Sequence, residues 1–489
     1  GNIATKGISA VTAGTSNFVA GVNAGNSITS GGNYNTVVGD EAGTAITTGD
    51  DCTAVGKSAL QANTTGSAQT AVGSGALATS TGSENTAVGY LALNNSAGAT
   101  SNTAVGYRSL DTNTTADNNT SVGHLAMYAN TTGASNVALG QGALRNNTTA
   151  ANNTAIGREA LFTNTTGHSN VAMGLNALND NTTASYNTSV GTYSMDKTTT
   201  GSNNTAVGYQ ALELNTTAYQ NTAVGVTSLK STTTGADNTG VGFSALFANT
   251  TGYNNTAVGK SSLSTNTTGA QNTAVGMQSL LSNTTGYNNS AVSTYALKAN
   301  TTGHSNTAVG LSSLQVNTTG NGNSSVGNSA GDSITTGENN AFLGLRAGHT
   351  FTTGSNNVCV GYEAGGSSTT DNNQLWIARS SGAVNSAGVW VYGDASGRCY
   401  QGNNSSSWST TSDERIKKDI VDSPNGLAKI DAMQVRNFNY KTQEEITEGG
   451  FTACDSEGLQ TGVIAQELES VLPECIVESD DGMKRVNID

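Results

Sequence analysis

The chain has 489 residues, of which 5% are aromatic and 11% charged, with 61 glycines and two prolines. Average soluble domains carry roughly 25% charged residues, so ordinary globular domains are disfavoured, and the lack of a glycine at every third position excludes collagen. The net charge is −14, and no apolar run reaches the ~18 residues that a membrane helix needs, so we expect no membrane insertion.

The charges divide the chain into two parts. Residues 412–489 hold 17 acidic and 8 basic side chains, 25 of the 54 in the whole chain, together with both prolines. The long first part is almost uncharged and offers no basic surface for nucleic acid, which we therefore exclude as a partner. Five cysteines show no metal-ligand spacing, and we expect free thiols.

A repeat governs the first part of the chain. Anchored on the glycine of N-T-A-V-G, it returns every 17 residues, with one step of 18 and one of 16, through 21 copies from Gly21 to Gly361. A clean copy, residues 254–270, reads N-N-T-A-V-G-K-S-S-L-S-T-N-T-T-G-A, and Ser293 replaces the anchor glycine once. Such a fixed period predicts a solenoid in which each copy forms one rung.

Positions in the repeat are numbered here from the anchor glycine. Slot −1 holds Val, Leu, Ile or Met in every copy but the first, slot −2 holds Ala, Ser or Gly from Ala54 to Ser325, and slot +4 is often Leu, as at Leu263. Slots −1 and −2 point to opposite faces of a strand. The small residue predicts close approach of another backbone, across the coil or at a symmetry axis. We expect φ > 0 at the anchor glycine and at the glycine of N-T-T-G.

The end copies differ from the middle ones in a coordinated way. In the first two and last three copies slot +4 is glycine, slot +7 is apolar in four of the five, and slot −2 is enlarged in four. Terminal repeats of a stacked array must seal an exposed core, so we interpret these copies as caps. The exchange involves Gly25, Gly43, Gly331, Gly348 and Gly365 at +4, Ile28, Ile46, Ile334 and Phe351 at +7, and Val19, Val37, Phe342 and Cys359 at −2.

Each rung offers two sizeable apolar side chains, at slots −1 and +4, for 17 ordered residues. This is little burial against the conformational entropy of ordering the rung, so we expect several chains to share one core. The N-T-A-V-G copies resemble the head repeats of YadA-like trimeric adhesins, which form a trimeric left-handed β-roll. The resemblance implies a homotrimeric β-solenoid.

The period stops after residue 366, and residues 367–411 contain two strand-like runs, 374–379 and 388–392, which predict a small β connector. Residues 412–489 contain T-S-D-E-R-I-K-K-D-I from Thr411 and T-G-V-I-A-Q-E-L-E-S-V-L-P-E from Thr461. Together these motifs resemble the C-terminal intramolecular chaperone of endosialidase-type phage tailspikes and tail fibres, an α+β domain. That family continues beyond the point where this sequence ends, so we expect a truncated domain.

The chaperone resemblance implies that the domain assists trimerisation and then cuts itself off between Thr411 and Ser412, with Ser412 and Lys417 as catalytic residues. A hydroxyl needs a neighbouring base to act as a nucleophile, and a lysine serves when burial lowers its pKa. On a helix beginning near Asp413, Lys417 lies about one turn from Ser412. Asp413 and Arg415 are expected to support the local structure. The alternative is that Ser412 or Asp413 only caps an exposed charged helix.

No cofactor and no metal is expected. The four histidines do not fall in one repeat slot, and the acidic residues are too scattered for a calcium-binding roll. We interpret the N-T-T triplets as turn-forming Asn with stacked Thr rather than as glycosylation sites.

Three function classes remain open. The first is the shaft of a viral tail fibre at the virion or extracellular surface, with a host glycan or protein as a second partner besides its own copies. The second is a bacterial trimeric surface adhesin, and the third is an ice-binding solenoid with ladders of paired threonines such as Thr284 and Thr285.

Overall fold

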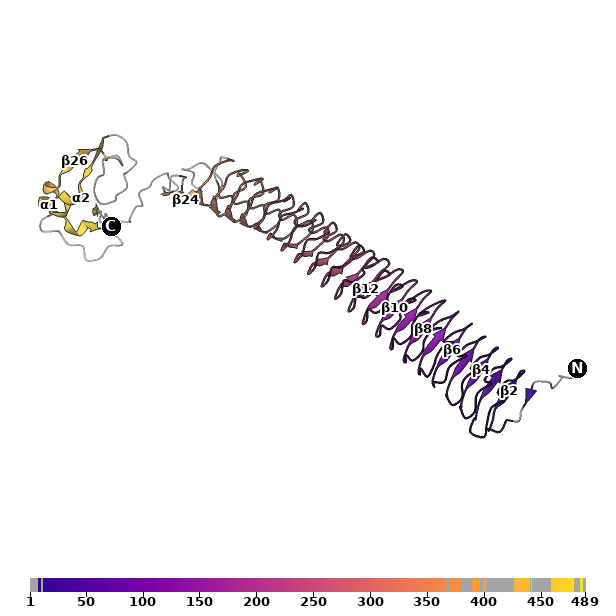
Figure 1. The fold of residues 1–489 in the computed structure, drawn as a ribbon. Helices are drawn as coiled ribbons and strands as arrows, with labels where there is room; N and C mark the ends of the chain where they lie inside the picture. Colours follow the sequence, from indigo (N-terminus) through magenta and orange to yellow (C-terminus); the bar gives the residue numbers. More distant parts are fainter. Residues whose placement is uncertain are drawn as a thin grey trace. The chain divides into compact units, whose positions relative to one another are not determined.

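The protein is described from a computed structural model covering residues 8–9, 12–365, 369–379, 389–393, 395, 399–401, 426–439, 441, 459–478 and 484–486. The chain divides into two compact units, Gly1–Ser406 and Ser407–Asp489. In the first unit a coil of stacked rungs follows the sequence from β2 onward, coloured indigo through orange in Figure 1. The first unit is the predicted all-β solenoid of 17-residue repeats.

The 21 repeats each contribute one three-residue strand to the coil. These strands are β2 (Phe18–Ala20), β3 (Thr36–Val38), β4 (Thr53–Val55), β5 (Thr70–Val72), β6 (Thr86–Val88), β7 (Thr103–Val105), β8 (Thr120–Val122), β9 (Val137–Leu139), β10 (Thr154–Ile156), β11 (Val171–Met173), β12 (Thr188–Val190), β13 (Thr205–Val207), β14 (Thr222–Val224), β15 (Thr239–Val241), β16 (Thr256–Val258), β17 (Thr273–Val275), β18 (Ser290–Val292), β19 (Thr307–Val309), β20 (Ser324–Val326), β21 (Ala341–Leu343) and β22 (Val358–Val360).

Consecutive strands pair in parallel with equal slots opposite each other. In one such pair Thr256, Ala257 and Val258 of β16 lie against Thr273, Ala274 and Val275 of β17. The short β1 (Ile8–Ser9) pairs antiparallel with β2 at the N-terminal end. The register follows directly from the 17-residue period, because one turn of the coil returns each slot above its own copy.

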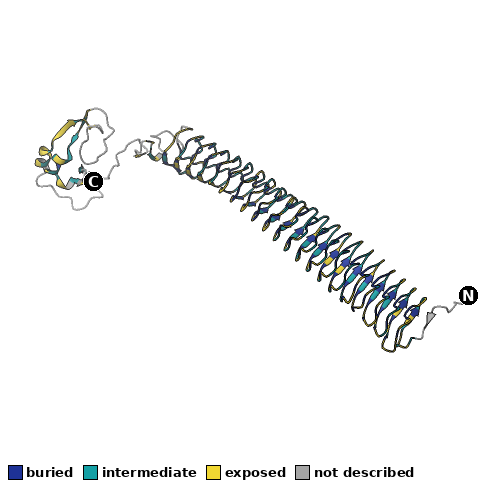
Figure 2. Ribbon diagram, in the orientation of Figure 1, coloured by how far each residue is buried: buried dark blue, intermediate teal, exposed yellow. Residues whose placement is uncertain are grey.

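The interior of the coil is built from small residues and one leucine per rung. Ala257 at slot −2 and Leu263 at slot +4 are fully buried, and their equivalents are buried along the coil. Figure 2 shows buried positions that recur from rung to rung. The close approach predicted for slot −2 is therefore across the coil, inside one chain. Val258 at slot −1, which we had counted toward the core, points outward and is 37% exposed in the single chain. Strand alternation correctly separated the two faces, but it could not tell which one the coil encloses.

Two ladders of buried asparagine run along the coil. At slot −4, Asn255 donates from Nδ2 to Oδ1 of Asn238 and to the Gly269 carbonyl, while its own Oδ1 accepts from the Asn272 backbone. At slot +7, the Asn of N-T-T, Nδ2 of Asn266 donates to Oδ1 of Asn249 in the preceding rung. These asparagines are fully buried. Nδ2 of Asn266 also donates to the Gly269 carbonyl three residues on, so the Asn of N-T-T closes a turn, as predicted, and lines the core as well. Each amide satisfies backbone groups that the narrow coil would otherwise leave unpaired.

The two recurrent glycines have different roles. The anchor glycines have φ between +120° and +145°, as predicted, and an added Cβ on Gly259 would lie 2.6 Å from the Gly276 carbonyl oxygen. The glycine of N-T-T-G, such as Gly269, does not have positive φ, so that expectation was wrong. This slot also accepts alanine, as at Ala150 and Ala184. Its requirement is small size beside the next rung, not a left-handed turn.

Ser293 occupies an anchor slot at φ +122°, where a residue with a Cβ is strained. We expect Ser293→Gly to raise the free energy of unfolding by about 1 kcal/mol, because relief of strain outweighs the added entropy of the unfolded chain. Urea unfolding of the full chain measures the change. The control is Ser290→Gly in β18, a strand position without positive φ, which should lower stability by about 0.5–1 kcal/mol. A loss of equal size in both variants would contradict the prediction.

The end rungs redistribute volume within the same core. Phe342 and Phe351 are buried and stack with centroids 6.1 Å apart. A Cβ on Gly348 at slot +4 would lie only 2.3 Å from the Phe342 ring. Glycine at +4 therefore makes room for the larger residues at slots −2 and +7, which explains why the three changes occur together.

The ladder extends one strand beyond the predicted end of the period. β23 (Leu375–Ala378) pairs in parallel with β22 in the same 17-residue register and places the buried Trp376 against Cys359. β24 (Val389–Gly393) and β25 (Cys399–Gln401) follow as antiparallel neighbours. The predicted strand-like runs are thus confirmed. The continuation was missed because Trp376 occupies a slot that is small in most rungs.

The described residues of the second unit form short helices and two antiparallel strand pairs. Its elements are α1 (Gly426–Ala432), β26 (Val435–Phe438), β27 (Gln460–Val463), α2 (Ala465–Glu469), a 3₁₀ turn η3 (Pro473–Cys475), β28 (Ile476–Glu478) and β29 (Lys484–Val486). β26 pairs with β27, and β28 pairs with β29. This mixture agrees with the α+β character expected of the C-terminal segment.

Candidate functional site

The predicted cleavage site lies outside the described residues. Thr411, Ser412, Asp413, Arg415 and Lys417 all fall within the segment 402–425, for which no placement is described. Their roles therefore remain predictions from the sequence. What the structure describes is the second motif of the same domain.

The second motif, residues 461–474, folds as a strand, a helix and a turn in succession. Thr461–Val463 form the end of β27, α2 begins at Ala465, and Pro473 opens η3, where its missing N–H is not needed. Helix α2 buries Leu468 and lies against β28 and β29. The motif is thus a connected structural unit that joins both strand pairs of the domain.

An ion pair ties the first strand pair to this helix. Arg436 on β26 donates from Nε and from one terminal nitrogen to the two carboxylate oxygens of Glu467 on α2, both at 2.9 Å. The hydrogen bonds from Arg436 lower the pKa of the Glu467 carboxyl. Planar two-point contacts of this kind fix orientation as well as distance. Arg436 is not among the residues predicted from the sequence, because its partner Glu467 is 31 residues away and no local pattern marks either residue as half of a pair.

The outer face of the shaft carries an exposed apolar row, here called the valine stripe. It consists of the slot −1 residues of strands β6 to β21, from Val88 to Leu343, which are exposed or half-buried in the single chain. The most exposed members, between 36% and 53%, are Val88, Leu139, Met173, Val207, Val224, Val258, Val275, Val292, Val309, Val326 and Leu343. Adjacent rungs lie ~4.8 Å apart, so the stripe is a continuous apolar surface on the order of 70 Å long. Surfaces of this size on soluble proteins mark interaction sites.

The paired threonines proposed as an ice-binding ladder are not equivalent. The first hydroxyl of each pair is bound within the coil: Oγ1 of Thr284, for example, donates to the Thr301 carbonyl at 3.1 Å. The second, such as Thr285, lies on the surface. The first threonine of each pair therefore stabilises the stacking of the rungs and does not present a free hydroxyl to solvent.

Neither a metal site nor a membrane-spanning helix is found among the described residues. They contain no cluster of three His, Cys, Asp or Glu side chains that could hold a metal ion. None of the helices in the described segments is long and apolar enough to cross a membrane. Cys52, Cys359, Cys399 and Cys475 have free thiols, as expected.

A comparison with protein families bears on the C-terminal segment. Residues 412–477 match the sequence profile of the family described as chaperone of endosialidase. The match begins at Ser412, includes the S-D-E-R-I-K motif and extends through the Arg436–Glu467 pair, α2 and η3. The chain therefore carries a chaperone-of-endosialidase domain at its C-terminus, following a β-solenoid body.

Proposed function

We propose that this chain is one of three identical chains of a viral tail fibre. The solenoid is the shaft, and the C-terminal domain drives trimerisation and then cuts the chain between Thr411 and Ser412. The observation that carries the proposal is the match of residues 412–477 to the chaperone family, which begins at the predicted nucleophile. A fibre of this kind belongs at the virion surface, where its exposed shaft meets the host.

The valine stripe supports assembly from identical chains. A partner must present apolar groups at the spacing of one rung over many rungs, and a second copy of this chain meets that condition by construction. Covering the exposed third of one valine is worth on the order of 1 kcal/mol, and the stripe repeats this gain at every rung of every chain. The sharing of apolar surface between chains thus supplies the burial that one thin coil lacks.

The proposed cut is an acyl transfer followed by hydrolysis. Oγ of Ser412 adds to the Thr411 carbonyl carbon while Lys417 Nζ takes the hydroxyl proton. The bond from this carbon to the Ser412 nitrogen breaks, and the nitrogen leaves as an amine after accepting that proton. Water then hydrolyses the resulting ester, which leaves a carboxylate on Thr411 and restores the Ser412 hydroxyl. No cofactor is required, and each chain reacts once.

The experiment is intact-mass measurement of the expressed full chain. We expect two species that correspond to residues 1–411 and the segment beginning at Ser412, and only the uncut chain from Ser412→Ala and from Lys417→Gln. Hydroxylamine should convert the ester to a hydroxamate on Thr411, which adds a diagnostic mass to the first fragment.

The control for the cleavage test is Ser409→Ala, which removes a hydroxyl three residues upstream and should be cut like the unchanged chain. Cleavage of Ser412→Ala at the same bond and rate would contradict the assignment of the nucleophile. A wild-type chain that stays uncut after assembly would contradict self-cleavage. It would not contradict the proposed trimer, which is tested separately by the mass of the assembly in solution.

A further inference from the structure

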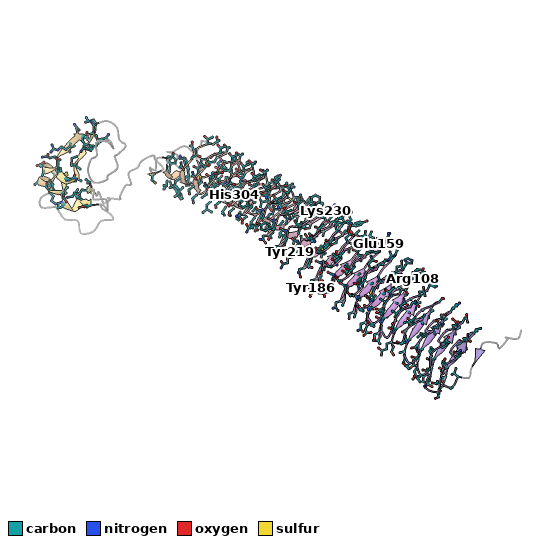
Figure 3. All side chains as sticks on the ribbon, viewed as in Figure 1. Arg108, Glu159, Tyr186, Tyr219, Lys230 and His304 are labelled. Carbon is teal, nitrogen blue, oxygen red and sulfur yellow. The ribbon has the colours of Figure 1, made fainter. Side chains whose placement is uncertain are left out.

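One hollow on the side of the shaft breaks the repetition of the coil. It has a volume of about 230 Å³, and three successive rungs contribute its polar and aromatic lining. We call it the Gly142 hollow. It lies on the edge of the shaft where Glu159 and Arg108 are labelled, opposite Tyr186 and Tyr219 (Figure 3). Besides Gly142, its lining includes His124, Gln141, Arg145, Glu159 and Phe162.

The hollow exists because one rung lacks a side chain at slot +2. The preceding and following rungs place Leu125 and Glu159 there, but this rung has Gly142. A Cβ added to Gly142 would lie 3.3 Å from the Phe162 ring and 3.5 Å from the Glu159 side chain. The one other rung with glycine at this slot, at Gly75, has no such space, because a Cβ there would lie 2.5 Å from Leu91.

A guanidinium group without a carboxylate partner lies at this hollow. The Arg145 guanidinium carbon is 5.5 Å from the centroid of the Phe162 ring. Among the described residues no acidic group lies within ion-pair distance of Arg145, whereas Glu159 pairs with Arg158 at 3.2 Å. Arg108, by contrast, forms an ion pair with Asp111 at 2.7 Å. The Arg145 donors thus remain available to a planar anion such as a carboxylate.

An ordered ring forms another part of the lining. His124 stacks on Tyr107 with centroids 5.2 Å apart, and Tyr107 stacks on Tyr90 at 5.5 Å. This three-ring stack holds His124 in place beside the hollow. With Phe162 it provides apolar ring surface, while the Gln141 amide and the Glu159 carboxylate provide hydrogen-bonding groups.

We propose that the Gly142 hollow binds one carboxylate-bearing sugar residue of a glycan. Arg145 binds the sugar carboxylate, the apolar C–H groups of the sugar ring pack on Phe162 and His124, and Gln141 and Glu159 bind ring hydroxyls. Glu159 accepts hydrogen bonds from hydroxyls and repels an anion that has none. The volume is below the ~300–1,000 Å³ of sites for drug-sized molecules, which favours a single ring.

This proposal rests on the proposed function, because it names the class of host ligand that the fibre would bind. The geometry of the site lies within one chain. Its lining residues come from three successive rungs of the same chain, so no sister chain is needed to complete the site.

The test is ligand-observed NMR on the full chain with methyl glucuronide, methyl glucoside and acetate as separate probes. The expected result is saturable binding of the glucuronide, at least tenfold tighter than of the glucoside or of acetate. Arg145→Gln should weaken glucuronide binding at least tenfold and remove the preference for the acidic sugar. Gly142→Asn should abolish binding, because asparagine fills the hollow and is already tolerated at this slot at Asn176, where φ is +54°.

The matched control is Ser261→Asn, the same new side chain at slot +2 of a distant rung, which should bind as the unchanged chain does. Equal binding of acetate or of the glucoside, no saturable glucuronide binding, or unchanged binding by Gly142→Asn would each overturn the proposal. The mass of each protein in solution is measured in parallel. A trimer that binds no sugar overturns this site alone, and a monomer that binds it overturns the assembly alone.

Discussion

Two lysines in the valine stripe, Val224→Lys with Val258→Lys, are expected to convert the proposed trimer to single chains. The two valines are 36% and 37% exposed in one chain and would be covered in the assembly. Three chains would bring three ammonium groups together at each of two rungs. Each substitution loses on the order of 1 kcal/mol of apolar burial between chains, and each buried charge costs several kcal/mol more. Native mass spectrometry in a Ser412→Ala background, which stays uncut, should then report about 49.2 kDa, the mass of one chain, instead of three times that value.

The control places the same charges on the same two rungs at another face. Thr234→Lys with Thr268→Lys changes exposed threonines at slot +9, which lie away from the stripe in sequence and in the rung. This variant should keep the mass of three chains. If both double variants dissociate, net charge rather than the stripe controls assembly, and if neither does, the stripe is not the interface.

The second large effect is expected on stability, when a single charge is buried in the asparagine ladder. In Asn255→Asp, a carboxylate oxygen would replace the Nδ2 that donates to the Gly269 carbonyl at 2.9 Å and to Oδ1 of Asn238 at 3.1 Å. Two attractive contacts become repulsive in a site without solvent. We expect a loss of at least about 3 kcal/mol in the free energy of unfolding at pH 7, measured by urea unfolding.

The loss in Asn255→Asp should depend on pH in a defined direction. Burial beside two acceptors raises the pKa of the new carboxyl above its unfolded value of ~3.9. The folded state then binds the proton more tightly, so stability is greatest below pH ~4 and falls as pH rises through the raised pKa. The exposed neighbour in Asn254→Asp serves as the control and should change stability by less than about 0.5 kcal/mol at any pH. A pH-independent loss in Asn255→Asp would contradict this account.

Much of the shaft could be predicted from the sequence, because each rung repeats one local solution. The 17-residue period requires equal slots to stack, and the anchor glycines indicate a backbone that only glycine adopts without strain. The coordinated changes in residue size around Gly348 and Phe342 predict the end rungs from the sequence, without knowledge of the contacts that these residues make. The C-terminal segment was recognised from two short motifs, and the family match covers the same residues. The roles of Ser412 and Lys417 remain predictions.

Other properties depend on how the coil closes, which no single repeat determines. Alternation along a strand separates Ala257 from Val258, but only the path of the remaining 14 residues of the rung puts the alanine inside and leaves the valine at the surface. The φ of Gly269 and the continuation into β23 also follow from neighbouring rungs. The repeat pattern was therefore enough to predict the period, the stacking of equal slots and the two chemistries of the chain. Which face is enclosed, and where a missing side chain opens a hollow, depend on residues brought together from different rungs and follow only from the closed coil.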